Sequence, residues 1–340
     1  MIKSPFSLGS VELPSNILCA PLAGCSDLPF RKMTSRYRPG LVYCEMVKID
    51  ALVRHDANTY HLLDYTDDMH PIGAQLCGSK PRLAYEAARI IEDLGFDVID
   101  LNCGCPVDKV TKDGSGSGLL QNPEKIGEIL SEMIRAVKIP VTVKIRAGWD
   151  EKTLNGPEIV KIAESAGAAA LTVHGRTREQ GYKGPANWDH IRACKQAAKK
   201  IQIIGNGDVF DAESAEKLFQ HTGCDGILVA RGTFGQPWII EDIYRHLSGL
   251  PKIERTIFDL KKAIHDHFIM ITNYQSERQA LLDMRRVGCW YLKPCSGAKS
   301  LRMQINQASS LESVFRLLEE FHWDALEIPK DLFFAQSGSC

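Results

Sequence analysis

Residues 141–148 read VTVKIRAG, a short apolar run that one lysine interrupts. Near-continuous apolar runs of this length are typical of parallel strands that are covered on both faces. Seven further runs of this kind occur in the first two thirds of the chain. They are NILCAPLA (from Asn16), GLVYCEM (Gly40), PIGAQL (Pro71), DVIDLNC (Asp97), AALTVHGRT (Ala169), IQIIGNGDV (Ile201) and DGILVARG (Asp225). The sequence therefore predicts eight buried parallel strands.

Amphipathic stretches separate most of these runs, and their apolar residues repeat at helical spacing. The predicted helices are Pro81–Leu94, Pro123–Ala136, Glu158–Ala166, Trp188–Lys199 and Ala212–Gln220. Eight strands with helices between them favour a (β/α)8 barrel. A doubly wound open sheet is the alternative, and the strand count argues against it.

The pattern changes near Leu250, after which no strand-like run occurs. Apolar residues recur at helical spacing from Ile257 to Ile271 and again from Leu311 to Phe321. The sequence therefore predicts a barrel over residues 1–248 and an all-helical domain over residues 249–340.

Bulk properties restrict the class of protein. Among 340 residues, 44% are hydrophobic and the net charge is −1, so there is no global attraction to nucleic acid or membrane. No apolar stretch is long enough to span a bilayer, and the N-terminus does not resemble a signal peptide. Eleven cysteines, an odd number, do not indicate a disulfide framework. We expect a cytoplasmic protein.

Seven of the predicted strands end in polar residues, and the carboxyl ends of barrel strands carry the functional groups of this fold. The polar ends include Glu45, Gln75, Asn102, Lys144, Arg146, His174, Arg176, Asn206, Asp208 and Arg231. Burying such groups without partners costs about 1–3 kcal/mol each, so we expect them to face a cavity.

Two of these ends also contain glycines that allow close approach of a ligand. Gly207 follows the seventh strand and Gly232 follows the eighth, where barrels often bind phosphate. Lys144 lies inside a strand and needs an anionic partner. A phosphate, a Schiff-base carbonyl or a reduced flavin would each serve, so a Schiff-base aldolase is an alternative at this point.

Cys103 and Cys105 flank one glycine at the end of the run that begins at Asp97. A zinc site would need a second cysteine pair at ligand spacing, and a thioredoxin-like pair would need two intervening residues. The GSGSG segment that follows lacks the Walker lysine. We therefore predict no metal site but one reactive thiol, and favour Cys105 because Asn102 and Cys105 flank the turn.

Seven motifs in register give the barrel a family resemblance. They are APLAGCSDLPFR (from Ala20), AQLCG (Ala74), DLNCGCPVDKV (Asp100), GSGLL (Gly116), VKIRAGW (Val143), LTVHGRT (Leu171) and IIGNGDV (Ile203). Together they resemble the tRNA-dihydrouridine synthases, and their spacing is most similar to the bacterial B-type branch. Cys25 and Cys103 depart from the apolar residues usual at these positions.

The resemblance implies FMN as cofactor, NADPH or NADH as reductant and tRNA as partner; we expect a monomer. The residues implied to contact the cofactor are Pro21, Leu22, Ala23, Gln75, Asn102, Lys144, His174, Asn206, Gly207, Asp208, Ala230, Arg231 and Gly232. Lys109 and Arg176 match positions near the substrate. Hydride from FMN N5 would add to C6 of uracil, and Cys105 would donate a proton to C5 as general acid.

A local basic region fits an RNA partner. Residues 252–302 contain ten Lys and Arg against five Asp and Glu, whereas residues 303–340 contain two against six. The candidates for contact with the RNA backbone are Arg285, Arg286, Lys293, Lys299 and Arg302. The alternatives are a barrel reductase of free pyrimidines, similar to dihydroorotate dehydrogenases, and a tRNA-binding protein without catalysis.

Overall fold

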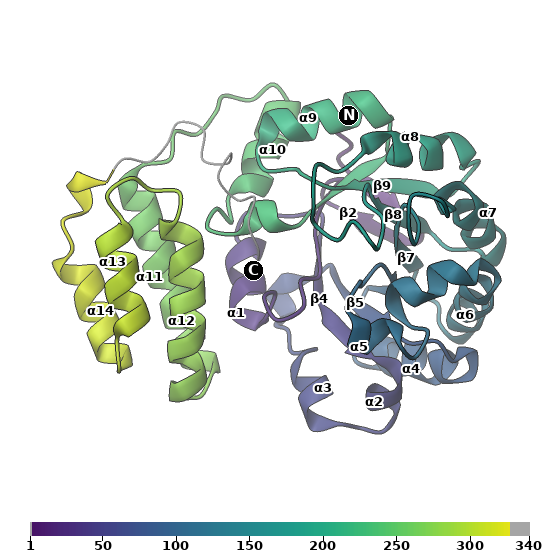
Figure 1. Cartoon of the computed structure of the whole chain (residues 1–340), viewed down its shortest axis with the longest axis horizontal. Helices are drawn as coiled ribbons and strands as arrows, with labels where there is room; N and C mark the ends of the chain where they lie inside the picture. The colour runs from purple at the N-terminus through teal and green to yellow at the C-terminus, as the bar shows by residue number, and fades with distance from the viewer. Residues whose placement is uncertain (1, 327–340) are drawn as a thin grey trace.

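Eight parallel strands close into a barrel in the computed structural model, which describes residues 2–326 (Figure 1). The strands are β3 (Ile17–Cys19), β4 (Leu41–Lys48), β5 (Ile72–Cys77), β6 (Val98–Cys103), β7 (Val141–Arg146), β8 (Ala170–His174), β9 (Gln202–Asn206) and β10 (Gly226–Val229). β10 pairs with both β9 and β3, which closes the ring. The predicted (β/α)8 barrel is thus confirmed, and the open-sheet alternative is wrong.

The helices that surround the barrel include all five predicted ones. The full set of surrounding helices in the described residues is α1 (Leu28–Ser35), α2 (Ile49–Val53), α3 (Ala57–His61), α4 (Pro81–Asp93), α5 (Asp108–Thr111), α6 (Pro123–Ala136), α7 (Gly156–Ala166), α8 (Trp188–Ala197), α9 (Ala212–Thr222) and α10 (Ile239–Leu247). The sequence interpretation did not predict α1, α2, α3, α5 and α10. Most of these are too short for apolar residues to repeat over several turns.

Strand register brings the polar strand ends to one rim. Asn102 pairs with Lys144 across β6 and β7, while Arg146 pairs with His174 across β7 and β8. His174 in turn pairs with Asn206 of β9. Because all eight strands run in parallel, these side chains meet at the carboxyl end of the barrel, where this fold places its functional sites.

A hairpin that the sequence interpretation missed closes the opposite end. It consists of β1 (Phe6–Leu8) and β2 (Val11–Leu13), paired antiparallel. The side chains of Phe6, Leu8 and Leu13 are buried among apolar residues from the barrel strands. The amino end of the barrel is therefore filled by protein.

The C-terminal domain is helical, as predicted. Its helices are α11 (Ile257–Tyr274), α12 (Glu277–Leu292), α13 (Lys299–Gln307) and α14 (Leu311–Glu320). α11 begins with a capping box in which Thr256 and Asp259 bind each other's backbone N–H groups. The predicted domain extends to residue 340, and residues 327–340 lie outside the described part of the chain. No helix in residues 2–326 is long and apolar enough to cross a bilayer.

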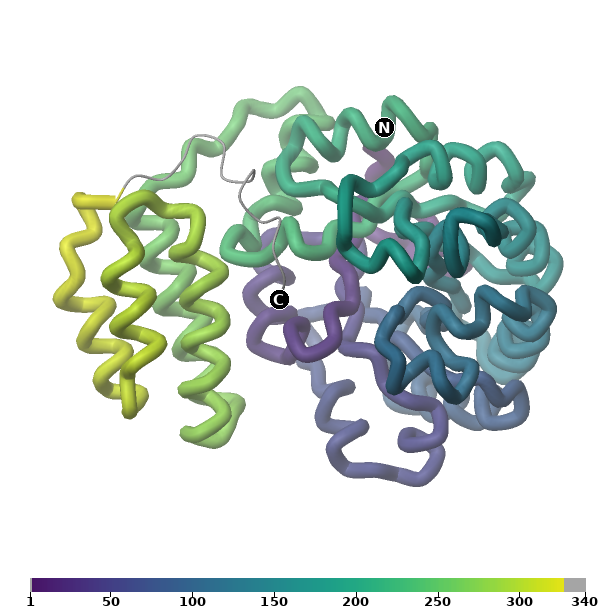
Figure 2. Tube along the Cα trace, in the orientation of Figure 1, coloured from purple at the N-terminus to yellow at the C-terminus, as the bar shows by residue number. Residues whose placement is uncertain are grey.

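The helical domain packs beside the barrel, next to α1, and an extended segment after α10 leads into it (Figures 1 and 2). Aromatic rings form the centre of the contact. Trp290 of α12 stacks on Phe234 at 4.2 Å between ring centroids, and Phe30 of α1 meets both rings edge-on. The two domains therefore share one apolar core.

Candidate active site

Cys105 lies on the loop that follows β6, and hydrogen bonds fix its backbone on both sides. The Asn102 side-chain oxygen accepts the N–H groups of Gly104 at 3.0 Å and of Cys105 at 2.9 Å. The backbone N–H and the hydroxyl of Ser117 both donate to the carbonyl of Cys105. Cys105 stays partly exposed. Cys103 is fully buried, and burial raises the pKa of its thiol well above the usual range. Of the two, Cys105 alone can meet a ligand.

Arg146 joins the Cys105 loop to the loop that follows β8. Its guanidinium is buried and donates to the carbonyls of Gly104 at 2.8 Å, of Thr177 at 2.9 Å and of Gly181 at 2.9 Å. Arg146 was predictable as a polar strand end, but its sequence position indicated no role. Its three acceptors lie up to 77 positions apart, so only the folded chain reveals the link between the two loops.

The buried amides of Gln75 and Asn102 orient each other. Asn102 donates to the Gln75 side-chain oxygen at 2.8 Å, and Gln75 donates to Asp100 at 2.7 Å. Thr142 also donates to Asp100, at 2.7 Å. Burial raises the pKa of Asp100 to about 6, although the hydrogen bonds from Gln75 and Thr142 act to lower it. Asp100 thus anchors both amides, a role that the sequence did not indicate.

Lys144 is a half-buried cation whose acidic neighbour is Asp100, which acts on it through its charge. Among residues 2–326 its ammonium group makes no hydrogen bond or ion pair, although part of the side chain is covered. Burial and then the charge of Arg146 lower the pKa of Lys144 to about 8. The charge of a bound anion would oppose both effects and raise the pKa of Lys144 again.

Further cations gather beside Lys144. Arg176 is only 3% exposed and pairs with Asp208 at 2.7 Å, and Arg231 contacts the same carboxylate at 3.2 Å. The Arg176 guanidinium also lies 3.2 Å from a ring nitrogen of His174. Burial, followed by the charges of Lys144 and the arginines, lowers the pKa of His174 well below its usual range. The imidazole is therefore neutral, and positive charge outweighs negative at this rim.

Arg176 and Asp208 have partners within the protein. In addition to the ion pair, Arg176 donates to the carbonyl of Gly184, and Asp208 accepts the N–H of Ala186 at 2.7 Å. The Asp208 carboxylate would repel a phosphate, so its contribution to a phosphate site is limited to its backbone and to orienting Arg231.

The two glycine turns leave no room for larger residues. Gly207 has φ +136°, and a Cβ there would lie 2.7 Å from the Cβ of Ala186. A Cβ on Gly232 would lie 2.3 Å from the carbonyl oxygen of Val209. The side-chain amide of Asn206, at the end of β9, donates a hydrogen bond to the carbonyl of Leu228 on β10. Glycine turns beside excess positive charge suit a phosphate group, so the residues present fit FMN.

Tyr182 is a site residue that the sequence interpretation missed. Its side chain is 57% exposed, and the guanidinium of Arg231 lies 4.5 Å from its ring centroid. Arg146 lies 5.7 Å from the same ring. An aromatic residue between two glycines in the segment GYKG was the only signal, and such segments are common in loops.

The remaining predicted residues lie on loops or on the helical domain. Pro21 and Leu22 are half-buried and Ala23 is exposed on the loop after β3, whereas Lys109 is exposed on α5. Ala230 is half-buried at the end of β10. Each of these residues is thus at or near the carboxyl rim of the barrel.

The predicted RNA contacts fall into two groups. Arg285 donates to the carbonyl of Ala308 at 2.8 Å, and Arg286 donates to the carbonyl of Gly24 at 2.6 Å. Lys293 and Lys299 are exposed and Arg302 is half-buried; within residues 2–326 none of these three forms an ion pair. The second group is the one available to a polyanion.

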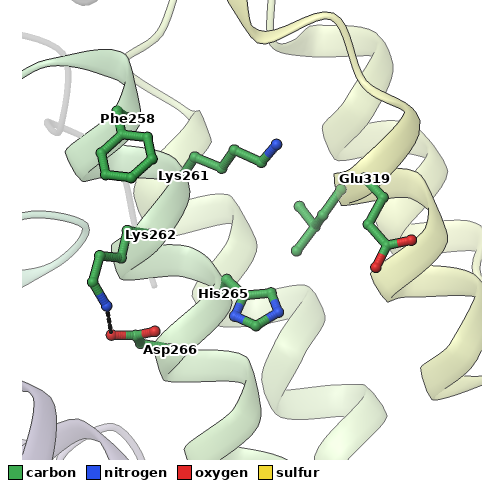
Figure 3. Close-up of a pocket in the computed structure, with 7 residues that line it drawn as sticks. Phe258, Lys261, Lys262, His265, Asp266 and Glu319 are labelled. Carbon is green, nitrogen blue, oxygen red and sulfur yellow. Dashed lines mark hydrogen bonds and ion pairs between the residues drawn. The ribbon is translucent and has the colours of Figure 1, made fainter.

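A cavity of about 280 Å³ lies on the helical domain, between α11 and α14 (Figure 3). Lys261 and His265 line one side and Glu319 the other, and the exposed ring of Phe258 stands at its edge. None of the residues at the carboxyl rim of the barrel lines it.

Within residues 2–326, no group of three or more His, Cys, Asp or Glu residues could hold a metal ion.

A parallel barrel with a partly exposed thiol and unbalanced cations at its carboxyl rim defines an enzyme of the (β/α)8 class. Histamine dehydrogenase from Rhizobium sp. 4-9 shares the fold, with a TM-score of 0.56 at 13% identity over 78% of this chain and 50% of that chain. Morphinone reductase gives a TM-score of 0.53 at 15% identity, over 75% of this chain and 91% of that chain.

Residues 18–326 match the model of the dihydrouridine synthase (Dus) family. A probable tRNA-dihydrouridine synthase of Rickettsia conorii is 37% identical over 95% of this chain and 98% of its own length. tRNA-dihydrouridine synthase B of Pseudomonas aeruginosa is 35% identical over 92% of this chain and 95% of its own length. The chain therefore belongs to the dihydrouridine synthase family of oxidoreductases, which confirms the resemblance drawn from its motifs.

Proposed function

We propose that this enzyme reduces the C5–C6 double bond of uridines in tRNA and so forms 5,6-dihydrouridine. Membership of the family and the names of its relatives support tRNA as substrate. The observation that carries the proposal is the position of Cys105, held by Asn102 at a rim where the ammonium group of Lys144 forms no ion pair within residues 2–326.

FMN is the proposed resident cofactor, with NADPH or NADH as reductant. When bound, the flavin supplies the hydride that adds to C6 of the uracil ring. Residues that would hold its phosphate are Asn206, Gly207, Asp208, Ala230, Arg231 and Gly232, and those that would line the ring are Pro21, Leu22, Ala23, Gln75, Asn102, Lys144 and His174. Lys144 would contribute positive charge beside the ring.

Cys105 is the proposed general acid. Its thiol would donate a proton to C5 of the uracil, so it must carry that proton when the substrate arrives. Asn102 and Ser117 fix the backbone of Cys105, and Arg146 fixes the neighbouring Gly104. These contacts keep the thiol at one place on the rim, as proton transfer requires.

The tRNA would span the two domains. Lys293, Lys299 and Arg302 are proposed to contact its phosphates, and Lys109 lies near the target base in this proposal. Arg176, held by its ion pair with Asp208, would line the entrance to the site at the carboxyl rim. The target base must leave its stack to reach the rim, at a cost of a few kcal/mol that these contacts offset. Action in the cytoplasm and a monomeric state belong to the same proposal.

The decisive experiment replaces the thiol. Purified wild-type protein should be yellow and should convert uridine to dihydrouridine in unmodified tRNA, as nucleoside mass spectrometry measures. Cys105→Ala should keep the flavin and lose activity by about 10²-fold or more, since general acid catalysis typically contributes that much. Cys103→Ala is the matched control, because that thiol is fully buried.

Three results would contradict the proposal. Turnover of Cys105→Ala equal to that of wild type would remove the acid role of the thiol. A protein that reduces free uracil but not tRNA, or a colourless one that only binds tRNA, would exclude the function itself.

A further inference from the structure

The loop between β3 and α1, residues 21–26, is held from both domains. The N–H of Gly24 donates to the buried carboxylate of Glu45 on β4. The carbonyl of Gly24 accepts a hydrogen bond from Arg286 of α12 at 2.6 Å. The barrel thus binds the N–H of Gly24, and the helical domain binds its carbonyl.

Arg286 is itself held in place. Its guanidinium pairs with Asp283 at 2.9 Å and lies 5.4 Å from the ring centroid of Trp290. Asp283 is only 2% exposed and also accepts from Gln279 at 3.1 Å. A buried carboxylate with one cation beside it keeps that cation in position, because separating them leaves an uncompensated charge.

The space beside the loop is lined by both polar and apolar side chains. A cavity of about 160 Å³ lies there, lined from the barrel by Gly24, Asp27 and Glu45 and from α12 by Gln279, Asp283 and Arg286. Burial raises the pKa of both Asp27 and Glu45. Leu22 and Cys25 pack against apolar residues, whereas Gly24 is exposed and depends on its hydrogen bonds to Glu45 and Arg286 for its position.

We propose that Arg286 is a positioning residue that fixes residues 21–26, so that the helical domain completes the flavin site. The proposal rests on the proposed function, because that function places Pro21, Leu22 and Ala23 against the flavin. It also changes the role of Arg286, which the sequence analysis assigned to RNA. Two nitrogens of this guanidinium are already committed to Gly24 and Asp283.

The test compares Asp283→Asn with the double variant Asp283→Asn/Arg286→Met. The first removes the buried charge but keeps the arginine, so the comparison isolates the contact with Gly24 from the cost of an unpaired carboxylate. Arg278→Met is the control for loss of charge, since Arg278 is an exposed residue of the same helix. Two quantities are measured: amide hydrogen exchange of residues 22–26 in flavin-free protein, and the Kd of FMN.

The double variant should exchange these amides faster than Asp283→Asn does, and should bind FMN about tenfold more weakly, as the loss of one hydrogen bond to a charged group predicts. Arg278→Met should change neither quantity. Arg286→Lys, which retains a donor, should recover part of the affinity. Unchanged exchange in the double variant would overturn the inference, as would faster exchange with unchanged FMN affinity. Failure of wild-type protein to bind FMN would instead contradict the proposed function, and the exchange measurement needs no flavin.

Discussion

The imidazole of His267 is buried in the helical domain, where one ring nitrogen lies 3.2 Å from the hydroxyl of Tyr291 and the other has no hydrogen-bond partner within residues 2–326. Burial, followed by the charges of Arg286 and Arg36, lowers the pKa of His267 to about 3. The folded protein thus keeps this residue neutral at pH values where the unfolded chain binds a proton. Its contribution to stability is present above pH 6.5 and is lost as the pH falls toward 3.

His267→Gln should remove this part of the acid sensitivity. Between pH 7 and pH 5, the free energy of unfolding of wild-type protein should fall by ~2 kcal/mol more than that of the variant. Urea unfolding at the two pH values measures the difference. His265→Gln, an exposed histidine of the same helix, should lose as much stability on acidification as wild type. Equal pH dependence of wild type and His267→Gln would show that the buried imidazole does not drive acid unfolding.

At the scale of elements, the close approach of α12 to the barrel depends on Gly235. This residue has φ +71°, and a Cβ there would lie 2.2 Å from the carbonyl oxygen of Trp290. Gly249, in the segment between the domains, has a similar φ of +68°, but no atom of the described residues would lie within 4 Å of a Cβ there. The two glycines share a left-handed conformation and differ in the space around them.

Gly249→Ala should cost about 1 kcal/mol of stability, from backbone strain alone. Gly235→Ala should cost about 3 kcal/mol or more, because the added methyl group also pushes against the backbone of α12. Thermal unfolding of the two variants measures the difference. Equal losses would mean that α12 can move away from Gly235 without disturbing the aromatic contact between Trp290 and Phe234.

At the scale of the whole molecule, charge is distributed unevenly on a chain whose net charge is −1. Lys293 and Lys299 are exposed on the helical domain without ion pairs in residues 2–326, so they can bind a polyanion without breaking a contact. Phosphate contacts of this kind release counterions, so they make binding depend on salt.

Lys293→Glu/Lys299→Glu should therefore weaken tRNA binding by about tenfold or more at low salt and flatten its salt dependence. FMN content should stay unchanged. Lys161→Glu/Lys217→Glu makes the same change of charge on exposed positions of α7 and α9, and should leave affinity within about twofold. Equal losses in both double variants would indicate a general electrostatic effect and not a local contact.

How far the sequence could predict the site depends on how local each signal is. The strand ends at Gln75, Asn102, Lys144 and His174 were predictable, because a polar residue in an apolar run stands out and parallel strands share one rim. The exposure of Cys105 was predictable, because Asn102 and Cys105 flank the turn after the strand. The roles of Asp100, Arg146 and Tyr182 were not, since each depends on partners from other loops or strands.

The sequence by itself determined the barrel, the appended helices and the family, because periodicity and motifs act over short stretches of chain. Only the tertiary structure decided which cations are paired. Arg286 and Lys293 lie seven positions apart on or beside α12, yet the first is bound to Gly24 and the second is exposed. A charge is free or engaged according to what the fold brings within about 4 Å of it: Arg286 pairs with Asp283 on its own helix, but the carbonyl that it also binds lies 262 positions away.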